Sequence, residues 1–369
     1  MANRLCMRLS ALATLALLWL CAPALAGEAV APSVGKPPGG PPVQLSGDTA
    51  SCLECHSDKE LTVTLKSGEE VSLFVDADAL ARSRHSKHGC TDCHADLKGS
   101  EGGHPKKRPP SAREMAVEYG KVCGGCHVEN GERMKDSVHR AAQDKGNLKA
   151  ATCTDCHGAH DAHRPNQPRA EIARTCSKCH TEIAQTFAKS VHGAALIDGN
   201  PDVPACTDCH TSHSIKDPKG AAWRLGLPDT CGTCHADAAK MSKYGISPNV
   251  LQTYLADFHG NTVSMLKAQN GQPLVALCTD CHGVHDIVNT KDPSSKVLAG
   301  NLVRTCRKCH PQATDSFPKA WMSHYEATWD KAPLVFSMNM FYRLFIPFVI
   351  AGLVLQIGLH LRKSWRQPK

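Results

Sequence analysis

Apolar residues gather at the two ends of this 369-residue chain, and the segment between them is predominantly polar. Near the N-terminus, Arg4 and Arg8 precede an apolar run from Ala11 to Leu20, and Ala24-Leu25-Ala26 follows that run. A basic start, a short apolar core and small residues before a cleavage point are the parts of a secretory signal. The pattern therefore predicts a signal peptide over 1–26 and an exported mature chain.

Cleavage after Ala26 would remove Cys6 and Cys21 with the signal. Cys21 also admits a lipoprotein, although Leu20 is larger than the residue expected before a lipidated cysteine. The following segment, 27–50, contains a Pro-Pro-Gly-Gly-Pro-Pro run and has little apolar content, so we expect a flexible tether there.

The C-terminal apolar stretch runs from Phe341 to Leu361. Its core, Leu344 to Leu359, would form about 24 Å of helix, slightly short of a bilayer core, so flanking side chains must reach to the interfaces. Four basic residues occupy the tail, 362–369: Arg362, Lys363, Arg366 and Lys369. Because such residues favour the cytoplasmic side, we expect a transmembrane helix over 341–361, a cytoplasmic tail and everything earlier outside. The alternative is a buried terminal helix.

Between the ends, one segment alternates apolar and polar residues with the period of a strand. Leu61 to Leu65 and Val71 to Val75 alternate on either side of Ser67-Gly68, which predicts a β-hairpin. Farther along, Ser247-Pro248 precedes an amphipathic run and places proline at the first turn of a predicted helix.

The polar region contains nine copies of Cys-X-X-Cys-His, which use 18 of the 20 cysteines. Two cysteines at this spacing can form thioethers to one porphyrin, and the adjacent histidine then binds its iron, so the motif predicts covalent c-type haem. The cysteines are Cys52, Cys55, Cys90, Cys93, Cys123, Cys126, Cys153, Cys156, Cys176, Cys179, Cys206, Cys209, Cys231, Cys234, Cys278, Cys281, Cys306 and Cys309. The proximal histidines are His56, His94, His127, His157, His180, His210, His235, His282 and His310.

Other uses of paired cysteines explain this pattern poorly. Zinc sites need no histidine after every pair, a thioredoxin-type dithiol would occur once, and a disulfide scaffold would not keep a two-residue gap nine times. We therefore expect nine haems.

The motifs repeat in a common plan of two per module. A first motif is followed by a lone histidine, a second motif, and a histidine three residues later; the lone histidine belongs to a Ser-X-His element in modules two and three and to Phe258-His259-Gly260 in module four. The plan divides a haem domain over 51–325 into modules 51–104, 123–163, 176–213 and 231–285, and a half-module 306–324. Module one departs from it, since His85 and His88 both match the Ser-X-His element and only His104 can replace the later histidine.

This plan supplies one histidine outside the motifs for each haem, as a candidate distal iron ligand. The candidates are His85 or His88, His104, His139, His160, His192, His213, His259, His285 and His324. Three residues are too few to wrap around a porphyrin, so a histidine such as His160 should bind the iron of a different motif from the one that it follows.

The composition favours a mainly α fold with extensive irregular coil, one short hairpin and one C-terminal transmembrane helix. Aromatic residues make up only 5% of the chain, so the porphyrins would form most of the core. The formal charge of +7 omits the haem propionates, which would add roughly −18 if all ionise. A nucleic-acid partner is therefore not expected.

The Ser190-Val191-His192-Gly193 element, followed by Cys206-Thr207-Asp208-Cys209-His210 and His213, resembles the multihaem cytochromes c of metal-reducing and related anaerobic bacteria. The resemblance covers about 50–325. It implies electron transport in anaerobic respiration, from a quinol-oxidising membrane cytochrome to periplasmic or outer-membrane cytochromes. Module one and the C-terminal anchor depart from the family pattern.

Two functions follow as hypotheses. Iron with two histidine ligands has no open position and a low potential, which suits electron transfer without catalysis. The alternative is a multihaem reductase of the nitrite, hydroxylamine or tetrathionate type, with one open haem, and His104 marks the weakest ligand. His360 lies either at the cytoplasmic interface or on a b-type haem shared with a partner subunit.

Overall fold

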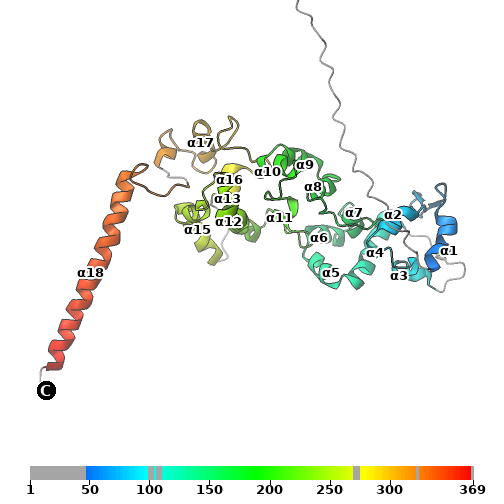
Figure 1. The fold of residues 1–369 in the computed structure, drawn as a ribbon, viewed down its shortest axis with the longest axis horizontal. Helices are drawn as coiled ribbons and strands as arrows, with labels where there is room; N and C mark the ends of the chain where they lie inside the picture. The colour runs from blue at the N-terminus through cyan, green and yellow to red at the C-terminus, as the bar shows by residue number, and fades with distance from the viewer. Residues whose placement is uncertain (1–46, 99–103, 105–109, 269–274, 321–323, 367–369) are drawn as a thin grey trace, which may run out of the picture. The chain divides into compact units, whose positions relative to one another are not determined.

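The computed structural model describes residues 47–98, 104, 110–268, 275–320 and 324–366. The predicted signal, nearly all of the tether and the last three residues of the tail lie outside these ranges. Within them the fold is mostly helical, with one two-stranded hairpin and one long apolar C-terminal helix (Figure 1). The predicted fold class is confirmed.

The hairpin lies between the first two cysteine motifs. Strand β1 (Thr62–Thr64) pairs antiparallel with β2 (Glu70–Ser72), and Val63 lies opposite Val71. Gly68 adopts a φ of 83°, a left-handed conformation that favours glycine in the turn. The hairpin is joined to helix α1 (Gly47–His56) by a hydrogen bond from the Val75 amide to the His56 carbonyl.

Each haem motif lies at or near the end of a helix. The helices with first motifs are α1, α4 (Ala112–Cys126), α8 (Glu171–Ser177), α12 (Ala221–His235) and α17 (Ala299–Cys306). The helices with second motifs are α3 (Cys90–Cys93), α7 (Cys153–His157), α11 (Cys206–His210) and α16 (Cys278–His282). In each of the four complete modules the second-motif helix packs against the first-motif helix.

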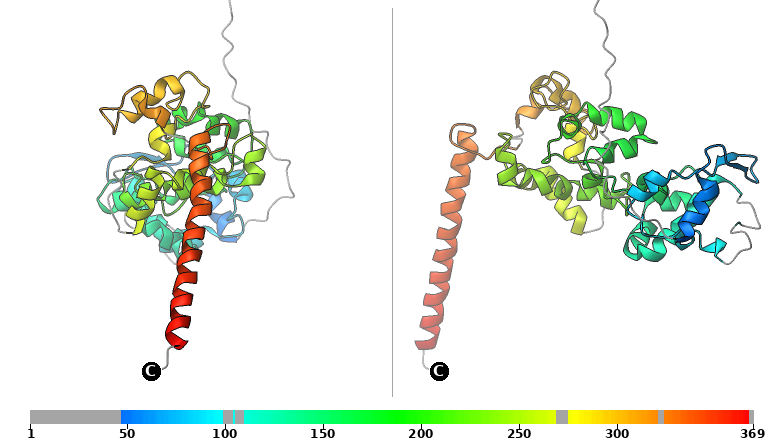
Figure 2. Two further views of the ribbon diagram at one scale, coloured as in Figure 1. Left: turned by 90° about the vertical axis from the view of Figure 1, so that its left-hand side faces the viewer. Right: turned by 45° about the vertical axis from the view of Figure 1, so that its right-hand side comes forward.

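The remaining helices connect these elements. They are α2 (Ala77–Arg82), η1 (Ala95–Leu97), α5 (Val128–Lys135), α6 (Val138–Asp144), α9 (Thr181–Ala188), α10 (Val191–Ile197), α13 (Ala238–Ser242), α14 (Val250–Leu255), α15 (Phe258–Ala268), η3 (Phe317–Ala320) and α18 (Pro333–Arg366). Figure 2 shows that α18 is much the longest of them.

The second-motif helices are only four or five residues long, too short to be stable alone. Each contains an aspartate between its two cysteines, and that carboxylate accepts the backbone N–H of the residue before the first cysteine. The four bonds are Gly89 to Asp92 (3.0 Å), Thr152 to Asp155 (2.6 Å), Ala205 to Asp208 (2.7 Å) and Leu277 to Asp280 (2.8 Å). The aspartate therefore satisfies an amide that the short helix leaves free.

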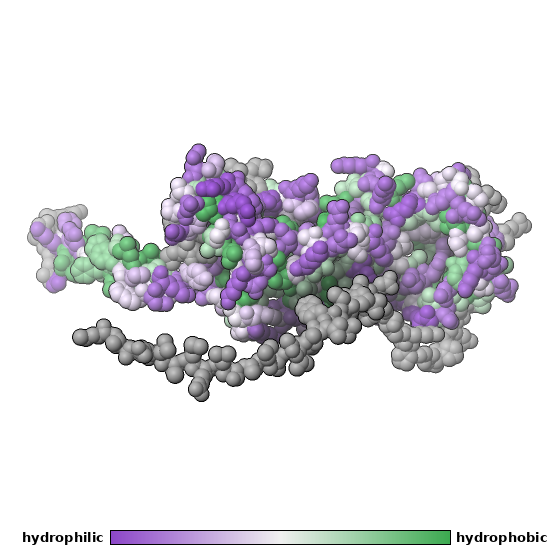
Figure 3. Space-filling model, turned by 90° about the horizontal axis from the view of Figure 1, so that it is seen from above, coloured by the Kyte–Doolittle hydropathy of each residue, from purple (hydrophilic) through white to green (hydrophobic). Residues whose placement is uncertain are grey.

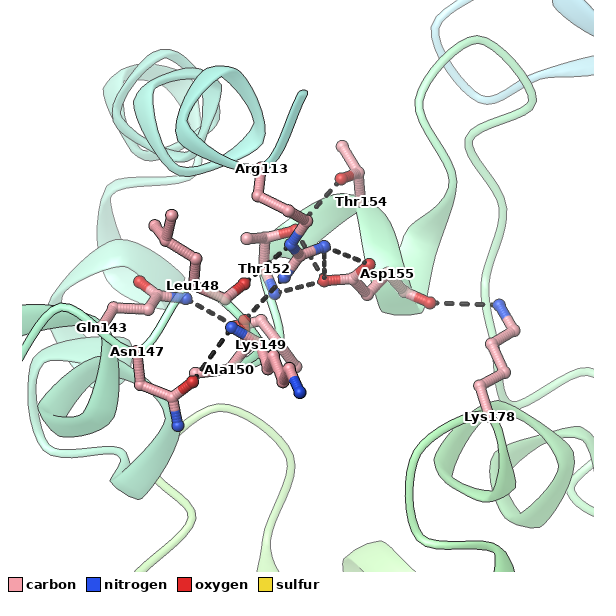
Figure 4. A network of polar contacts seen from close by, with 11 residues as sticks. Arg113, Gln143, Asn147, Leu148, Lys149, Ala150, Thr152, Thr154, Asp155 and Lys178 are labelled. Atoms are coloured by element: carbon pink, nitrogen blue, oxygen red, sulfur yellow. Dashed lines mark hydrogen bonds and ion pairs between the residues drawn. The ribbon is translucent and has the colours of Figure 1, made fainter. Parts of the chain in front are cut away.

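In modules two to four an arginine joins this aspartate to the start of the first-motif helix. Arg113 at the start of α4 donates to both Asp155 carboxylate oxygens, at 2.9 and 3.1 Å, and to the carbonyls of Leu148 and Ala150 (Figure 4). Arg169 pairs with Asp208, and Arg224 with Asp280 at 3.1 Å. These bridges hold the two haem motifs of one module together.

Apolar packing is confined to small clusters within modules. Leu225, Leu227, Tyr254, Val263 and Leu277 form one cluster in module four. Ile172, Leu196 and Ala205 form another in module three. The described residues thus contain little of the continuous apolar core that a domain of this size normally has.

The helix predicted to begin at Ser247-Pro248 begins later and is interrupted. Asn249 precedes α14, which ends at Leu255, and α15 then begins at Phe258. Asp257 accepts the Gly260 amide at 3.0 Å, so a carboxylate starts a second helix in the same gap between haem motifs. The prediction gave a start and no end, so the helix in this gap is confirmed, and only its start differs, at Val250 instead of Pro248.

Helix α18 begins at Pro333 rather than at Phe341, since the predicted range marked only the apolar stretch within it. It is long and apolar enough to cross a membrane, with a mean hydropathy of 2.2 over its best window. Its exposed side chains are mainly apolar (Figure 3). It could therefore serve as a membrane anchor.

We predict that Arg113→Ala lowers the free energy of unfolding by about 1–3 kcal/mol, because it removes charge-assisted bonds and leaves two carbonyls without their donor. Arg140→Ala is the matched control, since Arg140 pairs only with the exposed Asp144 one turn along α6, and it should cost less than about 0.5 kcal/mol. Guanidinium unfolding followed by far-ultraviolet circular dichroism measures both. Equal losses would contradict the role of Arg113.

Candidate functional site

Every motif histidine lies opposite one histidine from outside the motifs. Ring centroids in the nine pairs are 6.0–6.4 Å apart. The pairs, motif histidine first, are His56–His104, His94–His160, His127–His85, His157–His213, His180–His139, His210–His285, His235–His192, His282–His324 and His310–His259.

This separation fits one metal atom between two imidazoles. A metal–imidazole bond is about 2.0–2.1 Å long, so two rings that share a metal on a straight axis have centroids about 6 Å apart. Aromatic pairs in general have centroids anywhere from about 4.5 to 7 Å apart, whereas these nine pairs share one narrow separation, as a common metal–ligand bond length requires. The residues present therefore fit an iron atom held between each pair.

Nine of the ten candidate distal histidines lie in these pairs. His85, rather than His88, lies opposite His127. His88 instead lies with its ring 5.8 Å from that of His85 and with its Nδ1 3.5 Å from an Asp92 oxygen. His104, the least regular candidate in the sequence, lies opposite His56.

The pairs connect neighbouring modules. A first-motif histidine lies opposite the Ser-X-His histidine of the preceding module, as His180 does with His139. A second-motif histidine lies opposite the later histidine of the following module, as His157 does with His213. His160 accordingly lies opposite His94 and not His157. Only the His56–His104 pair lies within one module.

The serine of the Ser-X-His element positions its histidine. Ser83, Ser137 and Ser190 are buried, and their hydroxyls accept backbone N–H groups of the turn that follows: His85 (3.2 Å), His139 (3.3 Å) and Gly193 (3.0 Å). Ser137 and Ser190 are thereby the N-caps of α6 and α10. The cap fixes the first turn, which carries the distal histidine.

The residue between that serine and histidine makes a hydrogen bond to the next module. The amides of Arg84, Val138 and Val191 donate to the carbonyls of Ala162 (2.8 Å), Ile215 (2.8 Å) and Ile287 (2.9 Å). Each acceptor lies two residues beyond a distal histidine. This backbone hydrogen bond therefore joins the Ser-X-His element of one module to the segment that carries the later histidine of the next module.

The glycine after the histidine permits close backbone approach. A Cβ atom at Gly193 would lie 1.8 Å from the Phe187 carbonyl oxygen, and one at Gly260 would lie 2.0 Å from that of Tyr254. Only glycine lets the new helix begin against the end of the preceding helix.

Several motif histidines have hydrogen-bond partners at Nδ1, which leaves Nε2 for a metal. The partners are the Leu73 carbonyl for His56 (2.8 Å), the Tyr119 hydroxyl for His94 (2.6 Å) and the His163 carbonyl for His157 (3.2 Å). Each partner fixes the orientation of its histidine ring. Two of the three partners are backbone carbonyls, and the third is the Tyr119 side chain.

Burial favours the neutral form of several candidate ligands. It lowers the pKa of His282 to about 4 and also lowers the pKa of His160 and His192. The neutral imidazole is the form that binds metals. Burial raises the pKa of the Cys281 thiol to about 11.

Several of these supporting residues were missed at the level of sequence. The aspartate in Cys-Thr-Asp-Cys-His occurs in all four second motifs, so its repetition was a visible signal of a structural role. Arg169 and Arg224 each precede a first motif at the same spacing. Tyr119 carries no such repeat and could not be found this way.

Comparison with known families gives one match. Residues 146–185 match the family model for the doubled CXXCH motif, and they contain the motifs that begin at Cys153 and Cys176. No curated protein and no solved structure matches the chain. The match supports a multihaem c-type cytochrome, with haem iron bound covalently through Cys-X-X-Cys-His.

The choice between His85 and His88 gives a matched pair of variants. His85→Ala should convert one haem to a high-spin form that binds cyanide or carbon monoxide, because His127 would lose the ring opposite it. His88→Ala should leave every haem low-spin. Absorption and ferric electron paramagnetic resonance (EPR) spectra of the two purified variants provide the measurement. The reverse result would assign His88 as the ligand.

Proposed function

We propose that this chain is an exported, membrane-anchored cytochrome c with nine haems that carries electrons between other redox proteins. Each haem would be held by one motif and by the histidine opposite it. The observation that carries the proposal is that all nine motif histidines have such a partner.

Two histidine ligands leave no coordination position for a substrate. Such iron changes only its oxidation state, and its potential is lower than with a histidine and a methionine. The pairing supports electron transfer over the reductase alternative, which needs at least one haem with a free distal face. Within the described residues every motif histidine lies opposite another histidine, so no haem would have a free distal face.

The anchor and the export signal give the proposal its location. With a signal at 1–26 and the basic residues at the C-terminal end of α18 in the cytoplasm, the haem domain would face the periplasm. A donor in the same membrane, such as a quinol-oxidising cytochrome, would then reduce it. Periplasmic or outer-membrane cytochromes in an anaerobic respiratory chain would accept the electrons.

The relative orientation of the paired rings differs between the two motif positions. Interplanar angles are 11–32° in the four second-motif pairs and 32–55° in the five first-motif pairs. The histidine opposite a second-motif histidine lies in irregular chain, three residues after the next module's second motif except for His324, whereas the one opposite a first-motif histidine generally begins a helix. Two local structures therefore produce two ligand geometries.

A haem count with a ferric EPR spectrum tests the proposal. We expect nine haems per chain by pyridine haemochrome and only low-spin iron. Near-parallel rings split the iron d orbitals strongly, so the second-motif haems should give rhombic signals, while the more twisted pairs shift toward a large maximum g value. A high-spin signal that changes on adding nitrite would contradict electron transfer alone and support a reductase.

A further inference from the structure

We infer that the nine haems lie in single file in the order of their motifs, so that the haems at Cys52 and Cys306 are the two ends of the electron path. This inference rests on the proposed function and specifies its route. It follows from which cysteines and histidines of different motifs lie close together.

Within each complete module, the first cysteines of the two motifs are neighbours. The two motif helices pack against each other in all four modules, α1 with α3, α4 with α7, α8 with α11 and α12 with α16. This packing brings together the thiols of Cys52 and Cys90, Cys123 and Cys153, Cys176 and Cys206, and Cys231 and Cys278. Each of these sulfurs would be bonded to the edge of its own porphyrin. The two haems of a module must therefore approach each other edge to edge.

Between modules, the second cysteine of a second motif lies near a cysteine of the next first motif. The pairs close enough to interact electrostatically are Cys93 with Cys126, Cys156 with Cys176, Cys209 with Cys234, and Cys281 with Cys306. Helices α3 and α7 also pack against α4 and α8. The contacts within and between modules together form an unbroken series over all nine motifs.

Contacts between histidines support the links within the modules. Electrostatic contacts between different pairs join His94 to His56, His213 to His127, His210 to His180, and His282 to His235. These contacts, like those of the cysteines, join only consecutive motifs. The described residues therefore indicate no shorter route past any haem.

The two ends of the series differ from its interior. The Cys52 end is bounded by the hairpin, whose Leu73 carbonyl accepts from His56. At the other end, Phe317 lies with its ring 5.1 Å from that of His310. His324, opposite His282, is separated from the start of α18 only by 325–332, a segment that spans at most about 30 Å.

The short segment 325–332 indicates at which end of the series electrons enter. A donor embedded in the membrane would reach the Cys306 end first, and electrons would leave from the Cys52 end to an acceptor in the periplasm. Each electron would then reduce the ferric haems one after another, from the haem at Cys306 to the haem at Cys52.

The test injects electrons at one end and detects them at the other. In the mature holoprotein every native cysteine would be a thioether, so Lys59→Cys gives one free thiol near His56 for a photo-excitable ruthenium polypyridyl complex. His259→Met marks the haem at Cys306 by a distinct charge-transfer absorption and a higher potential. A flash transfers one electron from the excited complex to a ferric haem, and reduction of the marked haem is timed.

His139→Met then raises the potential of the central haem at Cys176 and makes it a trap. In single file, the marked haem should be reduced at least tenfold more slowly. Lys145→Met, at the residue that ends the same helix as its C-cap, is the control and should leave the rate unchanged. If His139→Met prevents haem incorporation, His192→Met places the trap at Cys231.

An unchanged rate in a trapped protein that retains nine haems would overturn the single-file order, as would the absence of transfer to the marked haem. If the proposed function itself were wrong, the protein without a trap would already show high-spin haem or fewer than nine haems, which distinguishes that failure from a failure of the single-file order.

Discussion

The exchange of histidines between neighbouring modules is the constraint on which the rest of this structure depends. Eight of the nine histidine pairs join different modules, and a module alone supplies both rings only for His56 and His104. A haem placed between two such rings would fasten one module to the next. The array would therefore gain stability as a repeat protein does, from the interfaces between adjacent units, with iron coordination replacing much of the apolar contact.

Short polar elements make this exchange possible in a chain with few apolar residues. The aspartate of each second motif accepts the free backbone N–H at the start of a helix that is too short to be stable alone. An arginine such as Arg113 then joins that aspartate to the first-motif helix. The serine of the Ser-X-His element plays a similar part at three of the distal histidines, as Ser137 does for His139. The protein thus fixes both ligands by hydrogen bonds along the backbone.

The sequence predicted the features that depend on residues close together in the chain. The hairpin around Gly68 and the apolar helix that contains Phe341 both follow from local pattern. The sequence did not reveal that Asp257 starts a new helix, because a single aspartate in an amphipathic run has no distinctive period. The preference for His85 over His88 opposite His127, and the bridge from Arg113 to Asp155, required contacts between segments far apart in the chain.

The central claim is that two histidines hold every iron. Near-infrared magnetic circular dichroism of the fully oxidised holoprotein tests it most directly, because the charge-transfer bands distinguish bis-histidine, histidine–methionine and high-spin haem. The account predicts bis-histidine intensity equal to the whole haem content. A high-spin or histidine–methionine band that amounts to one haem or more would contradict it.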